Sequence, residues 1–211
     1  MSTTASEGGD PVSDLAALAA EISRCTRCIL HQARTKAVPG EGPADAEIMF
    51  IGEAPGFHED QQGRPFVGAA GQYLEELLAM IGLKREQVFI ANVIKCRPPG
   101  NRDPLPEEIE ACKPFLDRQL ELIRPRCVVT LGRYSMARVL PTARISAVHG
   151  QPRKIDGVIY YPMYHPAAAL HQPSLRRIIE EDIRRIPELL KRVSQIEDSP
   201  PPLGAEQLKL F

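Results

Sequence analysis

The pattern of apolar and polar positions along the chain predicts strands that alternate with helices. Asp10 and Pro11 are typical of a helix start, and apolar residues follow at 3.6-residue spacing to about Cys25. Four short apolar runs are typical of buried strands, at 48–51, 88–93, 127–131 and 158–163. Helical patterns occupy 71–81, 106–123, 133–139 and 174–193. This alternation predicts an α/β fold with three α/β/α layers and a central four-stranded, mostly parallel sheet.

The ends of the chain differ from this pattern. We expect residues 1–10 to be a disordered N-terminus, 11–193 to form one domain, and the proline-rich 194–211 to be a flexible tail. A chain of 211 residues is long enough to bury a core in one domain. It has no apolar run of membrane-spanning length, and its start lacks the features of a secretory signal. We therefore expect a cytoplasmic protein with no membrane partner.

The five cysteines fall into two pairs and one single residue. Cys25 and Cys28 form a C-x2-C pair, and Cys96 and Cys112 form a second pair further along the chain. Their neighbours are largely basic, which disfavours a buried core position, and disulfides are uncommon in a reducing compartment. Four thiolates in two pairs suit either Zn²⁺ or an iron–sulfur cluster, and the spacing does not separate these two. Cys127 lies in an apolar strand and is interpreted as a core residue.

The net charge of −1 hides a strong segregation of charge along the sequence. Residues 124–154 carry +7 with no acidic residue, and residues 84–102 carry +4, so the rest of the chain sums to −12. Two basic segments on an acidic body can face a phosphate backbone while the molecule stays soluble. An ordinary solvated surface explains the same pattern equally well.

Polar residues follow the predicted strands at the points where they end. Glu53 comes after the first strand, Asn92 lies at the end of the second, and His165 follows the fourth. In an open α/β sheet, ligands bind at the carboxyl ends of the strands. The sequence therefore predicts that a carboxylate, an amide and an imidazole surround one cleft.

Several ordered blocks of this sequence resemble the signature blocks of family 4 uracil-DNA glycosylases, within the uracil-DNA glycosylase superfamily. The blocks are 52–56, 59–60, 63–68 with Gly71, 92–102 and 164–168, and the resemblance runs from the first helix to about residue 193. It implies an enzyme that flips uracil out of DNA and hydrolyses the N-glycosidic bond, leaving an abasic site for base excision repair. It also implies a [4Fe–4S] cluster, with Cys25, Cys28, Cys96 and Cys112 as its ligands.

The resemblance implies a role for individual residues. Glu53 and His165 match the catalytic positions: His165 donates to uracil O2 as negative charge forms there, and Glu53 positions water and stabilises the cationic sugar. The positions matching substrate-binding residues are Gly52, Ala54, Gly56, Glu59, Phe66, Asn92 and Leu170.

Four of these residues have specific expected tasks. The side chain of Asn92 carries an acceptor beside a donor, which matches the N3–H and O4 edge of uracil and mismatches cytosine. Phe66 offers a ring on which the flipped base stacks. Glu59 excludes the C5 methyl group of thymine. Leu170 fills the vacated position in the DNA stack.

Related functions remain as alternatives. Family 5 enzymes carry an apolar residue where this chain has Glu53. The covalently trapping UdgX-type relatives carry an Arg-Arg-Ile-His insertion, whereas here 61–65 run on without one. A non-catalytic, metal-dependent DNA-binding module would not need Glu53, Asn92 and His165. A redox sensor acting through Cys96 or Cys112 is a further alternative.

The last five residues resemble the pentapeptide with which bacterial proteins dock onto the replication sliding clamp. We expect contacts through Gln207, Leu208, Leu210 and Phe211, since the peptide is terminal and follows a proline-rich tether. An amphipathic tail end without function explains these residues equally well. The protein is otherwise expected to act as a monomer on uracil-containing DNA.

Overall fold

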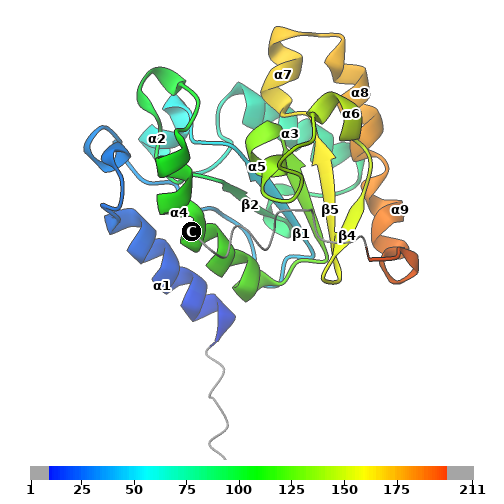
Figure 1. The fold of residues 1–211 in the computed structure, drawn as a ribbon, viewed down its shortest axis with the longest axis horizontal. Coiled ribbons are helices and arrows are strands. Elements are labelled where there is room, and N and C mark those ends of the chain that lie inside the picture. Colours follow the sequence, from blue (N-terminus) through cyan, green and yellow to red (C-terminus); the bar gives the residue numbers. More distant parts are fainter. Residues whose placement is uncertain (1–9, 199–211) are drawn as a thin grey trace, which may run out of the picture.

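A computed structural model describes residues 10–198 of the chain (Figure 1). The predicted disordered start up to residue 9 and the predicted clamp peptide lie outside these residues. Asp10 caps the first helix, because its carboxylate accepts hydrogen bonds from the amides of Val12 and Ser13. No helix within the described part of the chain is both long and apolar enough to cross a membrane.

The central sheet has five strands in the order β2-β1-β3-β5-β4. Four of them are parallel and match the predicted runs closely: β1 (Ile48–Gly52), β2 (Phe89–Asn92), β3 (Cys127–Leu131) and β5 (Val158–Met163). The prediction of four strands was one short. The fifth, β4 (Arg153–Ile155), pairs antiparallel with β5 through a turn at Asp156 and Gly157, both with positive φ. It has only three half-buried residues, so no apolar run marks it.

Helices cover both faces of this sheet, which confirms the three-layer α/β/α architecture (Figure 1). One face carries α1 (Pro11–Arg24) and α4 (Pro106–Ile123); the other carries α3 (Ala69–Met80), α8 (Leu175–Ile183) and α9 (Ile186–Lys191). The remaining helices and 3₁₀ turns are α2 (Phe57–Gln62), α5 (Arg133–Ala137), α6 (Ile145–Val148), α7 (Pro166–His171), η1 (Ile29–Gln32), η2 (Arg85–Gln87), η3 (Pro99–Asn101) and η4 (Val193–Gln195).

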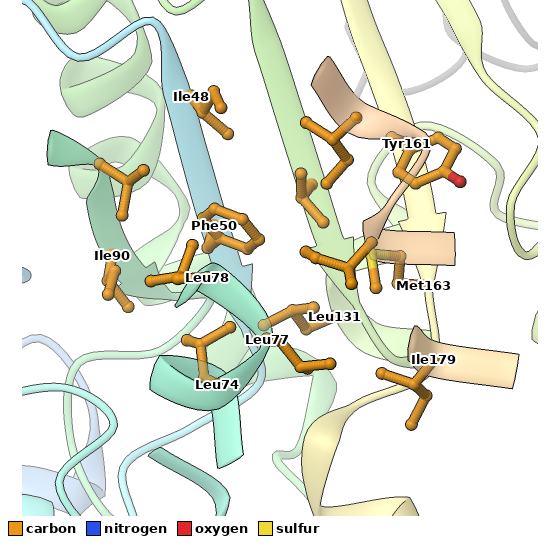
Figure 2. Close-up of a cluster of buried hydrophobic side chains, with 14 of the residues drawn as sticks. Ile48, Phe50, Leu74, Leu77, Leu78, Ile90, Leu131, Tyr161, Met163 and Ile179 are labelled. Atoms are coloured by element: carbon orange, nitrogen blue, oxygen red, sulfur yellow. The ribbon is translucent and has the colours of Figure 1, made fainter. Parts of the chain in front are cut away.

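Two hydrophobic cores lie on the two sides of the sheet. Figure 2 shows the core under α3 and α8, where Phe50 of β1 lies near Leu77 and Leu78 of α3. On the other side, Met49 and Ile51 pack with Ile22 of α1. Successive residues of β1 thus face opposite cores, which explains why the parallel strands are continuous apolar runs rather than alternating ones.

The C-terminal part departs from the expected single helix at 174–193. It breaks into α8 and α9, because Pro187 in the first turn of α9 has no amide hydrogen to continue the preceding helix. Residues 194–198 then return to the sheet: Lys154 Nζ donates to the carbonyl of Ile196 at 2.9 Å, and the amide of Gly157 donates to Asp198 Oδ1 at 3.1 Å.

Candidate active site and cysteine pocket

A cavity of about 420 Å³ opens at the carboxyl end of the parallel strands. Six residues predicted from the sequence line it, namely Ala54, Gly56, Glu59, Phe66, Asn92 and His165. Glu53, Gly52 and Leu170 do not line its wall. A larger groove of about 610 Å³ beside α1 contains none of the predicted site residues. Glu59, Asn92 and His165 therefore meet in the smaller cavity, whereas Glu53 lies outside its wall.

Gly52 lies directly behind the Phe66 and Asn92 side chains that line the cavity. A Cβ atom at this position would lie 2.6 Å from Phe66 Cζ and 2.4 Å from Asn92 Oδ1, so a larger residue would displace one of them. The Phe66 ring in turn lies nearly parallel to the imidazole of His165, with ring centroids 5.4 Å apart. Gly52 thus acts through the space it leaves for two neighbouring side chains.

Asn92 presents an unused acceptor at this wall. Its side chain is buried, and Oδ1 has no hydrogen-bond partner within residues 10–198. Its backbone carbonyl accepts from Lys95 Nζ at 2.9 Å, and the same ammonium donates to Gln119 Oε1 at 2.7 Å. A buried polar atom without a partner is costly, so it is typical of a ligand contact.

His165 is held in a defined state at the start of α7. Its Nδ1 accepts a hydrogen bond from the amide of Ala167 at 3.1 Å, which leaves the proton on Nε2. Burial lowers the pKa of His165 to about 4, although the Glu59 carboxylate opposes this. The side chain is therefore neutral near pH 7 and offers one N–H donor.

Glu53 follows β1 directly but stands beside the cavity rather than on its wall. It is half-buried, and burial together with the nearby Asp103 carboxylate raises its pKa, while Arg133 opposes the change. Asp103 and Arg133 form an ion pair with each other. The Glu53 carboxylate therefore sits at the predicted sheet edge, next to a pair of fixed charges.

Glu59 uses both carboxylate oxygens to hold the backbone. Oε1 accepts from the amides of Val67 and Gly68, each at 2.9 Å, and Oε2 accepts from the amide of Gly56 at 3.1 Å. A Cβ at Gly56 would come within 2.8 Å of Oε2. Glu59 thus lines the cavity in one fixed orientation and ties two loops together.

The rim includes residues that the sequence interpretation missed. Phe57, His58 and Asn101 also line the cavity. The Phe57 side chain is exposed, and the Arg97 guanidinium lies 5.1 Å from its ring centroid. The available signal was position alone, because Phe57 directly follows the block that ends at Gly56. Leu170 is also exposed, on α7 after His165.

Four cysteines line one small pocket between the end of α1 and α4: Cys25, Cys28, Cys96 and Cys112. As they stand, no group of three or more His, Cys, Asp or Glu side chains within residues 10–198 is arranged to hold a metal ion. Three of the sulfur atoms accept N–H bonds, from Arg27 N at 3.4 Å, Arg34 Nη1 at 3.0 Å and Lys95 N at 3.5 Å. The donor set and these N–H contacts fit a thiolate-bound metal centre.

Burial raises the pKa of several of the cysteine thiols. Cys127 is fully buried in β3, as predicted, and burial raises the pKa of its thiol to about 12. Burial also raises the pKa of Cys112 to about 11 and that of Cys96 above its ordinary value. A redox-sensing thiol needs a lowered pKa, so these positions disfavour the sensor alternative.

Comparison with known proteins identifies the family. A sequence model described as "Uracil DNA glycosylase superfamily" matches residues 39–186. The "Type-4 uracil-DNA glycosylase" of Sulfurisphaera tokodaii is 52% identical over 80% of this chain and 81% of that protein. The protein of the same name from Saccharolobus solfataricus is 49% identical over 82% of this chain and 85% of that protein. The chain belongs to the type-4 uracil-DNA glycosylase family.

Two further observations agree with membership in the type-4 family, one from a comparison and one from the fold. A "Type-5 uracil-DNA glycosylase" of Pyrobaculum aerophilum is less similar, 31% identical over 69% of this chain and 77% of that protein. In residues 61–65, where UdgX-type relatives carry an insertion, α2 ends at Gln62 and Gly63 turns the chain with a φ of 75°. The chain therefore leads directly from α2 to Phe66, with no room taken by an insertion.

The basic segments of this glycosylase-family chain are partly neutralised in the fold. From 124–154, four bases pair with acids of other segments, in Arg126–Glu47, Arg133–Asp103, Arg138–Asp117 and Lys154–Asp198. From 84–102, Arg85 and Arg102 are paired and Lys95 is buried. Arg176 and Arg177 pair with Glu180 and Glu181. Charge segregation along the sequence thus becomes ion pairing across the fold.

Proposed function

We propose that this chain removes uracil from DNA as a uracil-DNA glycosylase that turns over. The observation that carries the proposal is the unpartnered Oδ1 of Asn92, buried beside Phe66 and His165 in a cavity at the sheet edge. Uracil in a duplex is stacked and paired, so the nucleotide must leave the stack to reach such a cavity. The names of its relatives and its family membership support the same reaction.

Asn92 and Phe66 recognise the flipped base in this proposal. Asn92 Oδ1 accepts from uracil N3–H while its amide donates to O4, whereas cytosine presents an acceptor and a donor at these positions. Phe66 stacks on the base, and Glu59 closes the space next to C5. The three amide contacts of Glu59 support this last role, because they keep the carboxylate from moving away from a methyl group.

His165 and Glu53 carry the chemistry. As the bond between C1′ and N1 breaks, its electron pair moves into the uracil ring, and the Nε2–H of His165 stabilises the charge on O2. A neutral histidine suits this donation and is supported by the low pKa. Glu53 lies outside the base wall, so we assign it to the sugar side. There it stabilises the cationic sugar and orients the water whose oxygen bonds to C1′, and the proton that this water loses is balanced by protonation of the departing uracil anion.

We infer that Cys25, Cys28, Cys96 and Cys112 bind a [4Fe–4S] cluster. Their shared pocket and the three N–H contacts to sulfur support this assignment. When bound, the cluster would supply a covalent tie between the end of α1, the segment after Asn92 and α4. Because that segment also contains Lys95, the tie would steady the backbone that carries Asn92.

DNA contacts in this proposal are made around the cavity mouth. Leu170 fills the stack that the base has left, and Arg133, Arg176 and Arg177 contact phosphates once their exposed ion pairs open, which costs little. Arg124 and Arg126 precede β3, at the opposite end of the sheet from the cavity, so this proposal gives them no such contact. We further propose that the protein acts as a monomer in the cytoplasm. Docking to the sliding clamp through Gln207, Leu208, Leu210 and Phe211 would bring it to newly made DNA.

The reaction is tested by incubating the cluster-loaded protein with an oligonucleotide that contains one uracil, followed by alkali. Strand scission at the uracil, with many turnovers per protein, is the expected result. A non-catalytic binding module would retard the DNA without scission, and a trapping relative would leave a protein–DNA adduct on a denaturing gel. No scission with the cluster intact would overturn the proposal.

A further inference from the structure

Phe66 holds its ring in the cavity through an unusual backbone. Its φ is 53°, in the left-handed region that bulky residues rarely adopt. Such a conformation costs free energy and persists only where neighbouring groups hold it in place. The position of the ring between Gly52 and His165 therefore depends on whatever holds the segment 65–68.

Arg85 holds the carbonyl side of this segment. It lies in η2, away from the cavity wall, and its side chain is only 7% exposed. Nη1 donates to the carbonyl of Phe66 at 2.8 Å, and Nη2 donates to the carbonyl of Pro65. Nε donates to Glu41 Oε1 at 3.1 Å, which neutralises and orients the buried guanidinium. The planar guanidinium of Arg85 thus binds two successive carbonyl groups.

The other sides of the segment are held as well. Glu59 accepts from the amides of Val67 and Gly68, directly after the two carbonyls that Arg85 binds. Gly71 of α3 lies against the Phe66 carbonyl so closely that a Cβ there would be 1.9 Å from the oxygen. The left-handed residue is therefore fixed between a buried cation, a carboxylate and a helix backbone.

We propose that Arg85 is a positioning residue for base binding: it fixes the left-handed backbone at Phe66 and so sets the ring on which the flipped uracil stacks. The proposal rests on the role of Phe66 given under Proposed function. Lysine cannot replace arginine here, because an ammonium lacks the planar fork that reaches two carbonyls and a carboxylate at once. Arg85→Lys therefore keeps the charge beside Glu41 but releases the segment.

The test measures the inhibition constant of free uracil and the kcat of the cluster-loaded protein in Arg85→Lys, Phe66→Ala and the double variant. Base stacking of this kind is worth about tenfold in affinity. We expect the inhibition constant to rise about tenfold in Phe66→Ala and about fivefold in Arg85→Lys, with kcat in Arg85→Lys within about twofold of the parent. The inhibition constant of free uracil should be no higher in the double variant than in Phe66→Ala, because Arg85 acts through Phe66.

Arg64→Gln is the matched control. Arg64 also pairs with Glu41, at 2.7 Å, but makes no hydrogen bond to the carbonyls of 65–66. Its inhibition constant should equal that of the parent protein. Thermal unfolding of each variant identifies a loss of folding, and a lower Tm in Arg85→Lys with unchanged uracil inhibition would overturn the proposal as a purely structural role. Additive effects in the double variant would also overturn it. If Phe66→Ala left the inhibition constant unchanged, the stacking role itself would fail and the proposal with it.

Discussion

The imidazole of His165 lies nearly parallel to the ring of Phe66, at 23° and with 5.4 Å between ring centroids. The two residues come from opposite halves of the domain: Phe66 precedes α3, and His165 begins α7. Because Nδ1 is occupied by the amide of Ala167, the only N–H of the neutral imidazole is on Nε2. A stacking surface and a single donor therefore share one wall of the cavity.

Glu53 should control the acid limb of the pH–rate profile. Its pKa is raised by burial and by Asp103, and the carboxylate is the form that stabilises a cationic sugar. We expect kcat/KM to be constant near neutral pH and to fall about tenfold per pH unit once the pH drops below the raised pKa. Glu53→Gln should lower kcat about 100-fold and abolish this limb.

Glu47→Gln provides the control for that profile. Glu47 lies at the other end of the same strand region, exposed and paired with Arg126. Its profile should match that of the parent protein. An acid limb that persists unchanged in Glu53→Gln would assign the titration to another group.

His165 should not produce a step in activity near the ordinary pKa of histidine. Its pKa of about 4 keeps the ring neutral across the physiological range, so kcat should be flat from about pH 6 to 8. His165→Ala should lower kcat about 100-fold, as the loss of one donor to a developing charge does. The inhibition constant of free uracil should change less than kcat. A rate that followed a group titrating near pH 6.5 would contradict the assigned neutral donor.

Asn92→Asp should remove the preference for uracil. A carboxylate cannot donate to O4 of uracil, but it can accept a hydrogen bond from the N4 amino group of cytosine, which the amide of Asn92 mismatches. We expect uracil excision to fall about 100-fold, and the ratio of uracil to cytosine excision to fall further still. Excision measured on matched oligonucleotides with uracil, cytosine or thymine checks this. Retained discrimination would move base recognition away from Asn92.

Cys112 and Cys127 should respond differently to substitution. Cys112→Ser should remove the brown colour and broad visible absorbance of an iron–sulfur cluster, and it should lower Tm, because the tie between α1 and α4 is lost. Cys127→Ala removes a core thiol in β3 and should lower Tm moderately while the absorbance stays. Iron and sulfide analysis of both variants completes the measurement. A colourless parent protein that contains zinc would refute the cluster.

Deletion of residues 207–211 should abolish binding to the sliding clamp while leaving excision from a short oligonucleotide unchanged. Lys209→Ala is the matched control, since the peptide's expected contacts are made by its other four residues. Affinity for the clamp, measured by surface plasmon resonance, distinguishes the two variants. Equal affinity of the deletion variant and the parent protein would exclude the peptide.

The sequence predicted the elements that a local pattern marks. The four parallel strands are near-continuous apolar runs because both faces are buried, so their bounds agree within one or two residues. The sequence did not predict β4, because its three half-buried residues leave no such run, although Asp156-Gly157 is a typical hairpin turn. Pro187 marked the break between α8 and α9, and helical periodicity continued across it.

Only part of the site was predicted from the sequence, because chain position fixes some of its residues and contacts between distant segments fix the others. Asn92 and His165 stand next to strand ends, so chain position alone places them at the sheet edge. The hydrogen bonds from Arg85 to the carbonyls of 65–66 join segments that are distant along the chain, and no local pattern encodes them. The pairing of Arg133 with Asp103 is equally non-local. Summed charge along a segment therefore predicted more free positive charge than the fold leaves.

The strand order has a consequence for how this scaffold can change over evolution. Asn92 ends β2 and His165 follows β5, with β1 and β3 between them. Neighbouring strands are about 4.8 Å apart, so the main chain sets these two strand ends roughly 14 Å apart. Mutations on the strands cannot rescale that span without breaking the hydrogen-bonded ladder. Descendants that accept a different base must therefore change side chains at or beyond the strand ends, at positions such as Asn92, Phe57 and Glu59, while the spacing of the sheet is inherited unchanged.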